Sequence, residues 1–167
     1  MSDSTNLCLA CGLCCSGTLI GFVQLGSEEL PVLRELLDVE NSNGEGFFLQ
    51  PCKKYCDGCT IYSKRPKQCA KYECELLKSV EQKEIDFDTA IETIQVVKQQ
   101  KIAIEKQLAL LPLELKSESF YFKMVELNKL FQKNQSESSL PQTHLNLMSD
   151  LAQLERLLSK RFGVSFF

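Results

Sequence analysis

The cysteines are the residues of this chain whose type and spacing are best suited to chemistry. Nine of them occur in 167 residues, all between Cys8 and Cys74. The first four have the spacing Cys8-x2-Cys11-x2-Cys14-Cys15, and each Cys-x2-Cys step can bring two sulfurs together. Tetrahedral metals and iron–sulfur clusters need several thiolates that converge on one point. The spacing therefore predicts a protein that binds metal through thiolates.

A second group of five cysteines lies in the middle of the chain: Cys52, Cys56, Cys59, Cys69 and Cys74. Cys56-x2-Cys59 repeats the tight spacing, and Cys69-x4-Cys74 puts two ligands about one helical turn apart if that segment is helical. In the first group, Cys14 and Cys15 point apart in extended backbone, so they can serve two metals, or one can lie beside the ligands. Neither group is an evident closed site, and the number of sites, one or two, stays open.

Charge separates the cysteine region from its surroundings. Residues 52–78 hold seven bases and three acids, whereas residues 1–51 hold one base and seven acids. Eight thiolates carry roughly −8 charges, and two divalent ions return only about +4. The basic excess is suited to offset part of the remainder. The alternative is that these lysines form an ordinary solvated face.

Composition restricts the protein class. The net charge of −3 gives no basic footprint for nucleic acid, so we expect no nucleic-acid partner. We expect no membrane partner either, because no apolar run approaches the roughly 20 residues that cross a bilayer. The first six residues lack the basic and apolar parts of a signal peptide. We therefore expect a cytoplasmic protein whose thiols stay reduced, and the odd cysteine count also disfavours a scaffold of disulfides.

Catalytic motifs are scarce. His144 is the only histidine and lies beyond the cysteines on an expected helix, which disfavours a catalytic Cys–His pair and a histidine ligand. Neither a phosphate-binding loop nor a dinucleotide fingerprint nor a His-Glu-x-x-His motif is present. Cys52-x3-Cys56-x2-Cys59 has the spacing of radical S-adenosylmethionine enzymes, but the surrounding residues give that interpretation no support. The sequence names no catalytic residue and favours a binding protein over an enzyme.

The cysteine pattern resembles a known family. The residues that carry the resemblance are Cys8-x2-Cys11-Gly12-x-Cys14-Cys15, then Cys52, then Cys59-x-Ile61-Tyr62-x2-Arg65-Pro66-x2-Cys69, followed by Cys74. The pattern is similar to that of the YkgJ-type CxxCxxCC cysteine-cluster proteins, which are described as zinc- or iron-chelating domains. The resemblance covers residues 8–74. It implies eight metal ligands: Cys8, Cys11, Cys14, Cys15, Cys52, Cys59, Cys69 and Cys74. Cys56 departs from the family pattern and is either a replacement ligand or an extra thiol.

The same resemblance bears on function. It implies a protein that coordinates zinc or iron, with an iron–sulfur cluster as one form of the iron. A related cluster occurs in flagellin lysine N-methylases, which gives the alternative of an iron–sulfur methyltransferase or redox protein. Arg65 and Pro66 favour a scaffold role, in which the arginine hydrogen-bonds carbonyls or sulfur and the proline starts a helix.

The expected fold class is α+β, with a metal-binding head at residues 1–80 and a helical region at residues 81–167 packed on it. We expect strands at Thr18–Leu25, at Phe47–Leu49 and at Thr60–Tyr62. Ser27 is the expected N-cap of a helix that ends before the turn cluster Asn41–Gly46.

The region after the cysteines shows the period of amphipathic helices. We expect helices from Cys69 to Lys83 and from Asp88 or Thr89 to Leu111. Two further stripes of apolar residues follow, separated by the polar connector Asn134–Ser139. The stripe residues are Ala90, Ile94, Val97, Ile104, Leu108, Leu111, then Phe120, Met124, Leu127, Phe131, then Leu147, Leu151, Leu154 and Leu158, with Lys101 as an exception. They predict a helical core, or else a face for a protein partner or for self-association.

Overall fold

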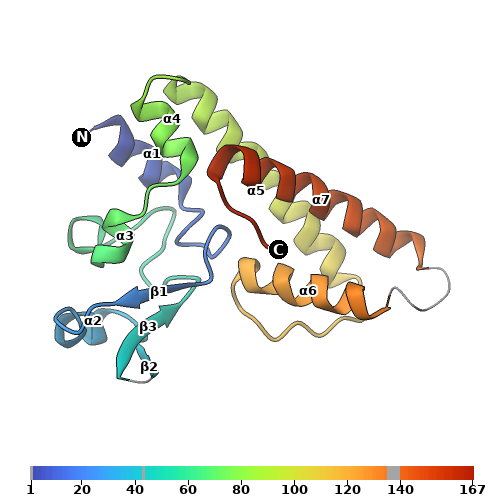
Figure 1. Cartoon of the computed structure of the whole chain (residues 1–167), viewed down its shortest axis with the longest axis horizontal. Coiled ribbons are helices and arrows are strands. Elements are labelled where there is room, and N and C mark those ends of the chain that lie inside the picture. The colour runs from blue at the N-terminus through green and yellow to red at the C-terminus, as the bar shows by residue number, and fades with distance from the viewer. Residues whose placement is uncertain (1, 43, 135–139) are drawn as a thin grey trace. The chain divides into compact units, whose positions relative to one another are not determined.

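The computed structural model describes residues 2–42, 44–134 and 140–167. The chain forms two compact units. The head unit contains Met1–Glu73 and Glu118–Tyr121, and the helical unit contains Cys74–Ser117 and Phe122–Phe167. Figure 1 shows that the strands lie in the first part of the chain, while long helices make up the rest. This combination of a small antiparallel sheet with many helices confirms the α+β class.

The head unit begins with a helix that the sequence analysis missed. Helix α1 (Asp3–Cys11) starts at Ser2, whose hydroxyl accepts a hydrogen bond from the Thr5 amide, and ends at Gly12 with φ of 63°. Only Leu7 of this helix is buried, so it has no apolar stripe to reveal it. The Ser2 cap followed by an acid in the first turn is the signal that marks it.

The sheet has three antiparallel strands in the order β1-β3-β2. Strand β1 (Phe22–Leu25) pairs with β3 (Glu45–Leu49), which also pairs with β2 (Glu40–Ser42). The expected first strand is thus shorter at its beginning. Strand β2 overlaps the segment expected to be only a turn, because the chain forms a tight hairpin there.

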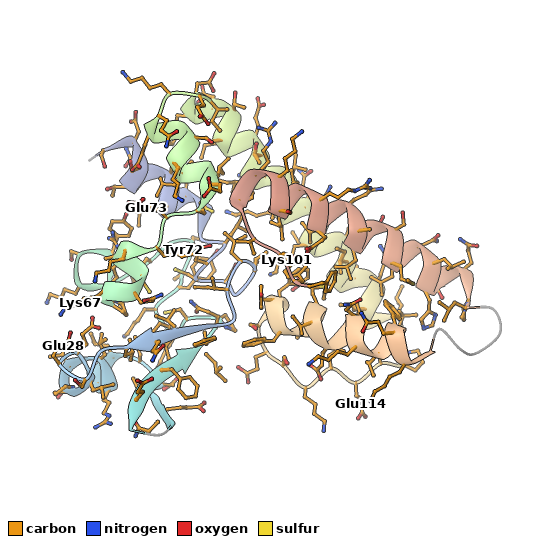
Figure 2. All side chains as sticks on the ribbon, viewed as in Figure 1. Glu28, Lys67, Tyr72, Glu73, Lys101 and Glu114 are labelled. Carbon is orange, nitrogen blue, oxygen red and sulfur yellow. The ribbon has the colours of Figure 1, made fainter. Side chains whose placement is uncertain are left out.

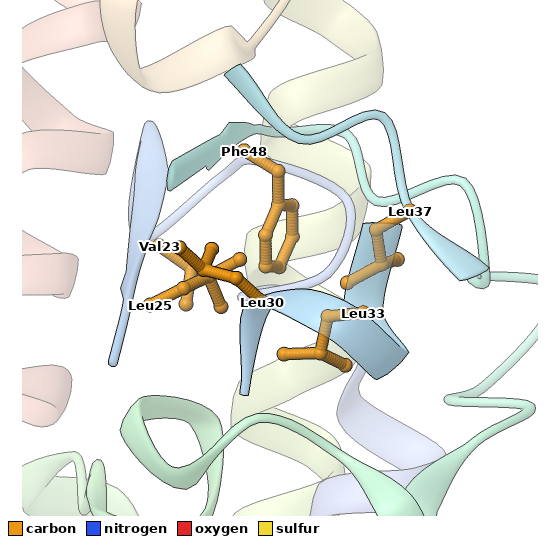
Figure 3. Close-up of a cluster of buried hydrophobic side chains, with 6 residues drawn as sticks. All are labelled: Val23, Leu25, Leu30, Leu33, Leu37 and Phe48. Carbon is orange, nitrogen blue, oxygen red and sulfur yellow. The ribbon is translucent and has the colours of Figure 1, made fainter. Parts of the chain in front are cut away.

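A short helix covers one face of this sheet. Helix α2 (Leu30–Leu36) buries its leucines against β1 and β3, as Figure 3 shows for Leu30 and Leu33 beside Phe48. The complete buried cluster is Val23, Leu25, Leu30, Leu33, Leu37 and Phe48. The expected Ser27 cap is wrong, because the helix begins after Glu29, with a proline in its first turn.

The segment between the sheet and the helical unit is more broken than expected. The strand expected at Thr60–Tyr62 is wrong, because the chain forms a turn and the 3-10 helix η1 (Tyr62–Lys64). The single expected helix is two helices, α3 (Lys67–Lys71) and α4 (Glu75–Glu81). Cys69 and Cys74 therefore do not share a helix, since the backbone is extended at the intervening Tyr72.

The helical unit contains α4, α5 (Phe87–Ala109), most of α6 (Phe120–Asn134) and α7 (Gln142–Phe162), and α5 packs against α7. The stripes are confirmed as core: the buried members are Ala90, Ile94, Val97, Ile104, Phe120, Met124, Leu127, Phe131, Leu147, Leu151, Leu154 and Leu158. Leu108 and Leu111 are only half-buried. Lys101, labelled in Figure 2, extends its ammonium to Glu105 at 3.3 Å, which explains a lysine within the stripe.

The end of α7 follows the expected pattern. Gly163 is the left-handed residue after the helix, and its amide bonds to the Leu158 carbonyl. The polar connector expected at Asn134–Ser139 lies outside the described residues apart from Asn134, which ends α6. In the described part of the chain, no helix has both the length and the apolar character that spanning a membrane requires.

Candidate metal centre

Eight of the nine cysteines belong to the head unit. They come from α1, from the turn after it, from the loop that follows β3, and from α3. All eight except Cys56 are half-buried, and Cys56 is exposed. Cys74 is the first residue of the helical unit and precedes α4.

The first group of cysteines is fixed by a helix end and a tight turn. Cys8 and Cys11 are three residues apart on α1, which places their side chains on one face. After Gly12 the chain reverses, with the Ser16 amide donating to the Gly12 carbonyl at 2.8 Å. A second bond, from the Thr18 amide to the Leu13 carbonyl at 2.9 Å, closes the turn that contains Cys14 and Cys15.

Four cysteines from separate segments lie beside this turn, each near enough to act electrostatically on at least two of the others. The Cys52 amide donates to the Cys15 carbonyl at 2.8 Å, which joins the loop after β3 to the first group. The thiol of Cys15 faces the sulfur of Cys59, and Cys52 is close enough to act on both. Cys69, from α3, is in turn influenced by Cys52 and Cys59. We call Cys15, Cys52, Cys59 and Cys69 the four-thiol cluster.

The thiols of this cluster differ in how readily they ionise. The contact with Cys59, together with burial, raises the pKa of Cys15, whereas the contact with Cys15 lowers the pKa of Cys59. Burial raises the pKa of Cys52, and burial with the charges of Cys52 and Cys59 raises the pKa of Cys69 to about 12. A metal ion must therefore displace protons when it binds here.

Two basic residues face these sulfurs. The Arg65 guanidinium donates to the Tyr62 carbonyl at 2.9 Å and stacks on the Tyr62 ring at 3.7 Å. Held in this way, its charge favours the ionised forms of Cys59 and Cys69. The Lys54 amide donates to the Cys52 sulfur at 3.4 Å, and the charge of Lys54 acts on the same thiol. Arg65 thus makes the expected hydrogen bond to a backbone carbonyl and places a positive charge near Cys59 and Cys69.

Other lysines of the basic segment have carboxylate partners instead. Lys67 pairs with Glu28 at 2.6 Å, and these two side chains are labelled side by side in Figure 2. Lys53 pairs with Asp38 at 3.0 Å on the surface of the head unit. For these lysines the solvated-face interpretation is the better one, since exposed pairs contribute little energy.

In the described residues, thiols lie near one another, but they are not arranged in the geometry of a metal site. No group of three or more cysteine, histidine, aspartate or glutamate side chains among them is arranged to hold a metal ion. The donor type nevertheless suits zinc or iron, because both metals are bound by thiolates and the four-thiol cluster offers four sulfurs in one region.

Two residues singled out by sequence lie outside this cluster. Burial raises the pKa of Cys74, opposed by the backbone amides of Leu77 and Leu76. His144 lies on α7, where its ring makes an edge contact with Phe131 at 6.0 Å between centroids. His144 is half-buried in the helical unit and is not part of the four-thiol cluster.

One residue near the cysteines carried no signal in the sequence. Tyr55 is half-buried, and a Cβ atom on Gly12 would lie only 2.6 Å from its ring. Burial, with the charges of Asp57, Cys15, Cys11 and Cys56, raises the pKa of the Tyr55 hydroxyl. A tyrosine in a cysteine-rich loop is common enough that only the fold reveals this contact.

Comparisons with known proteins found no family model, no curated protein and no solved structure that matches this chain. The resemblance to the YkgJ-type proteins therefore stays a prediction that rests on the cysteine motif.

Proposed function

We propose that this protein binds zinc or iron through its cysteines, with the four-thiol cluster as the main site. The observation that carries the proposal is the proximity of Cys15, Cys52, Cys59 and Cys69, which are all half-buried and act on one another electrostatically. Thiols of a cytoplasmic protein have little reason to gather in this way unless they share a ligand. A structural zinc ion or an iron–sulfur cluster would draw these four sulfurs together and stabilise the head unit.

Electrostatics supports the same site. Four thiolates around one divalent ion leave a charge of about −2. Arg65 and Lys54 face Cys59, Cys69 and Cys52, so they offset this charge where it arises. The remaining predicted ligands of the head unit, Cys8, Cys11 and Cys14, supply a second site or complete a larger cluster.

The proposal is tested by the metal content of single variants of the full chain. Cys69→Ser removes a member of the four-thiol cluster, and Cys11→Ser removes a predicted ligand of the first group. Both should lower the bound zinc or iron per chain, measured by elemental analysis after anaerobic purification. Cys56→Ser is the matched control and should do much less harm, because Cys56 is exposed.

The outcomes separate the ligands from the other thiols. Full metal content and an unchanged melting temperature in both Cys69→Ser and Cys11→Ser would refute the ligand assignment. Loss of metal in Cys56→Ser would move that residue into the ligand set. A brown protein with acid-labile sulfide would identify an iron–sulfur cluster, and a colourless protein with stoichiometric zinc would identify a zinc site.

A further inference from the structure

Tyr55 is held between two turns that carry cysteines. Its amide donates to the Cys52 carbonyl at 3.0 Å, and its backbone forms an isolated antiparallel bridge with Cys59. These contacts fix the position from which the side chain extends. The ring therefore reaches the first cysteine group from the loop that follows β3, which is distant from that group in the sequence.

The ring lies directly on the backbone at the end of α1. A Cβ atom on Gly12 would be 2.6 Å from Cε2 of Tyr55 and 2.9 Å from its hydroxyl oxygen. Only glycine permits such an approach. Gly12 follows Cys11 and precedes the turn of Cys14 and Cys15, so the ring covers the link between these cysteines.

Three thiols lie near this side chain: one from the end of α1, one from the turn after it and one from the residue that follows Tyr55. Cys11, Cys15 and Cys56 all act electrostatically on its hydroxyl group. Cys11 and Cys15 are half-buried, whereas Cys56 is exposed. The neighbouring turn also contacts α1, because a Cβ on Gly58 would lie 3.2 Å from the Leu9 carbonyl oxygen. The half-buried ring thus lies against the Gly12 backbone, with the thiols of Cys11, Cys15 and Cys56 near enough to act on its hydroxyl group.

We propose that the aromatic ring of Tyr55 shields Cys11 and Cys15, and so sets how fast chelators and thiol reagents reach this side of the cysteine region. The role belongs to the ring and not to the hydroxyl group, because the ring atom Cε2 makes the closest approach to Gly12. The shielding of sulfur holds with or without metal. Only its effect on metal release rests on the proposed function.

The first test uses the metal-free full chain and iodoacetamide. In this reaction a thiolate sulfur displaces iodide and forms a thioether, and mass spectrometry of peptides gives the rate at each cysteine. Tyr55→Ala should raise the rates at Cys11 and Cys15 by about 3- to 10-fold, since reactivity follows exposure. Tyr55→Phe, which keeps the ring, should leave both rates near those of the original chain.

Internal references are available in the same experiment. Cys56 is exposed and should react fast in every variant, while Cys69 should keep its rate in every variant. Phe22→Ala removes an exposed ring, 50% accessible and in contact with Phe47, and should change neither Cys11 nor Cys15. Unchanged rates in Tyr55→Ala overturn the proposal. An equal rise at Cys69, or a rise in Tyr55→Phe as large as in Tyr55→Ala, also overturns it.

The second test follows metal release from the loaded chain to a coloured chelator. Tyr55→Ala should release metal several-fold faster than the original chain and Tyr55→Phe, at equal metal content. Equal release rates in all three would overturn the role in metal release. If the original chain binds no metal, the proposed function fails, and the iodoacetamide rates still decide whether Tyr55 shields the thiols.

Discussion

The two units of this molecule are built from different kinds of interior. The helical unit has a continuous apolar core, in which Ile104 and Met124 are fully buried together with leucines of α7 such as Leu154. The head unit has one small apolar cluster under a sheet with strands of three to five residues. Beside that cluster lie half-buried thiols, and Cys52 and Cys69 pack against it.

This difference indicates what each unit needs in order to stay folded. Apolar burial stabilises the helical unit without any ligand. Half-buried thiols contribute less to the free energy of unfolding than buried aliphatic side chains do. Because the apolar cluster of the head unit is small, we expect this unit to be only marginally stable without a ligand. Metal binding would supply the missing stability because its free energy is available only to the folded ligands.

We expect the largest effect when the proposed metal is removed, and we expect it in the head unit alone. Removing the metal with a strong chelator should lower backbone hydrogen-exchange protection in β1, β3 and α3 by orders of magnitude. Protection in α5 and α7 should change little. Mass spectrometry of peptides from the full chain measures both. Unchanged protection in the head unit, in a chain shown to have lost its metal, would remove the distinction between the units.

A substitution in the apolar core of the helical unit should destabilise that unit and leave the proposed metal site intact. Leu154 is fully buried on α7, so Leu154→Ala should lower the free energy of unfolding of this unit by about 2–5 kcal/mol. Metal content per chain should stay the same. Urea unfolding monitored by circular dichroism, with elemental analysis alongside, measures both quantities. If Leu154→Ala also lowered the metal content, metal binding in the head unit would depend on the core of the helical unit, and the two units would not be stabilised independently.

Alkaline pH should weaken the metal-free head unit. The pKa of Cys69 is raised to about 12, so above the ordinary thiol value of 9.0 the unfolded chain loses a proton that the folded chain keeps. The free energy of unfolding should therefore be fully retained below pH 9 and fall as the pH rises toward 12. Hydrogen exchange within head-unit peptides, corrected for its pH dependence, measures the trend. A metal-loaded chain without this alkaline loss is the control, and identical behaviour would count against ligation by Cys69.

A smaller effect should distinguish two glycines of the head unit. Gly12→Ala places a left-handed alanine at φ of 63°, at a cost of about 1–2 kcal/mol, and adds the contact with Tyr55. Gly44→Ala is the matched control, with φ of 83° and nothing within 4 Å of its Cβ. Gly12→Ala should therefore destabilise the chain more in urea unfolding.

The double variant separates strain from contact. In the Tyr55→Ala background, Gly12→Ala should cost no more than Gly44→Ala, because the ring is gone. If the extra cost of Gly12→Ala persists without the ring, the close approach of Tyr55 is not its cause.

The helical unit was the more predictable of the two from sequence. Stripes such as Leu147 to Leu158 depend on a period within one helix, and burial of one face follows from that period. Helix α1 was missed because it buries only Leu7, and its Ser2 cap is a weak local signal. The broken segment at Tyr72 was missed because the residues on both sides favour a helix.

The candidate site was predictable in its residue types but not in its grouping. Spacing predicts that the cysteines are metal ligands, since tight pairs suit metal ligation, and this stays a prediction. The neighbours Cys15 and Cys59 are far apart in the sequence, and only the turn after α1 and the loop after β3 bring them together. The approach of Tyr55 to Gly12 is likewise a long-range contact that no local pattern encodes.

The measurement that tests the central claim most directly is the metal content of the anaerobically purified full chain, together with the alkylation rate of each cysteine before and after metal removal. The account predicts stoichiometric zinc or iron, and protection of Cys15, Cys52, Cys59 and Cys69 that disappears with the metal. A chain without metal that takes up neither zinc nor iron, with alkylation rates that metal addition leaves unchanged, would contradict it.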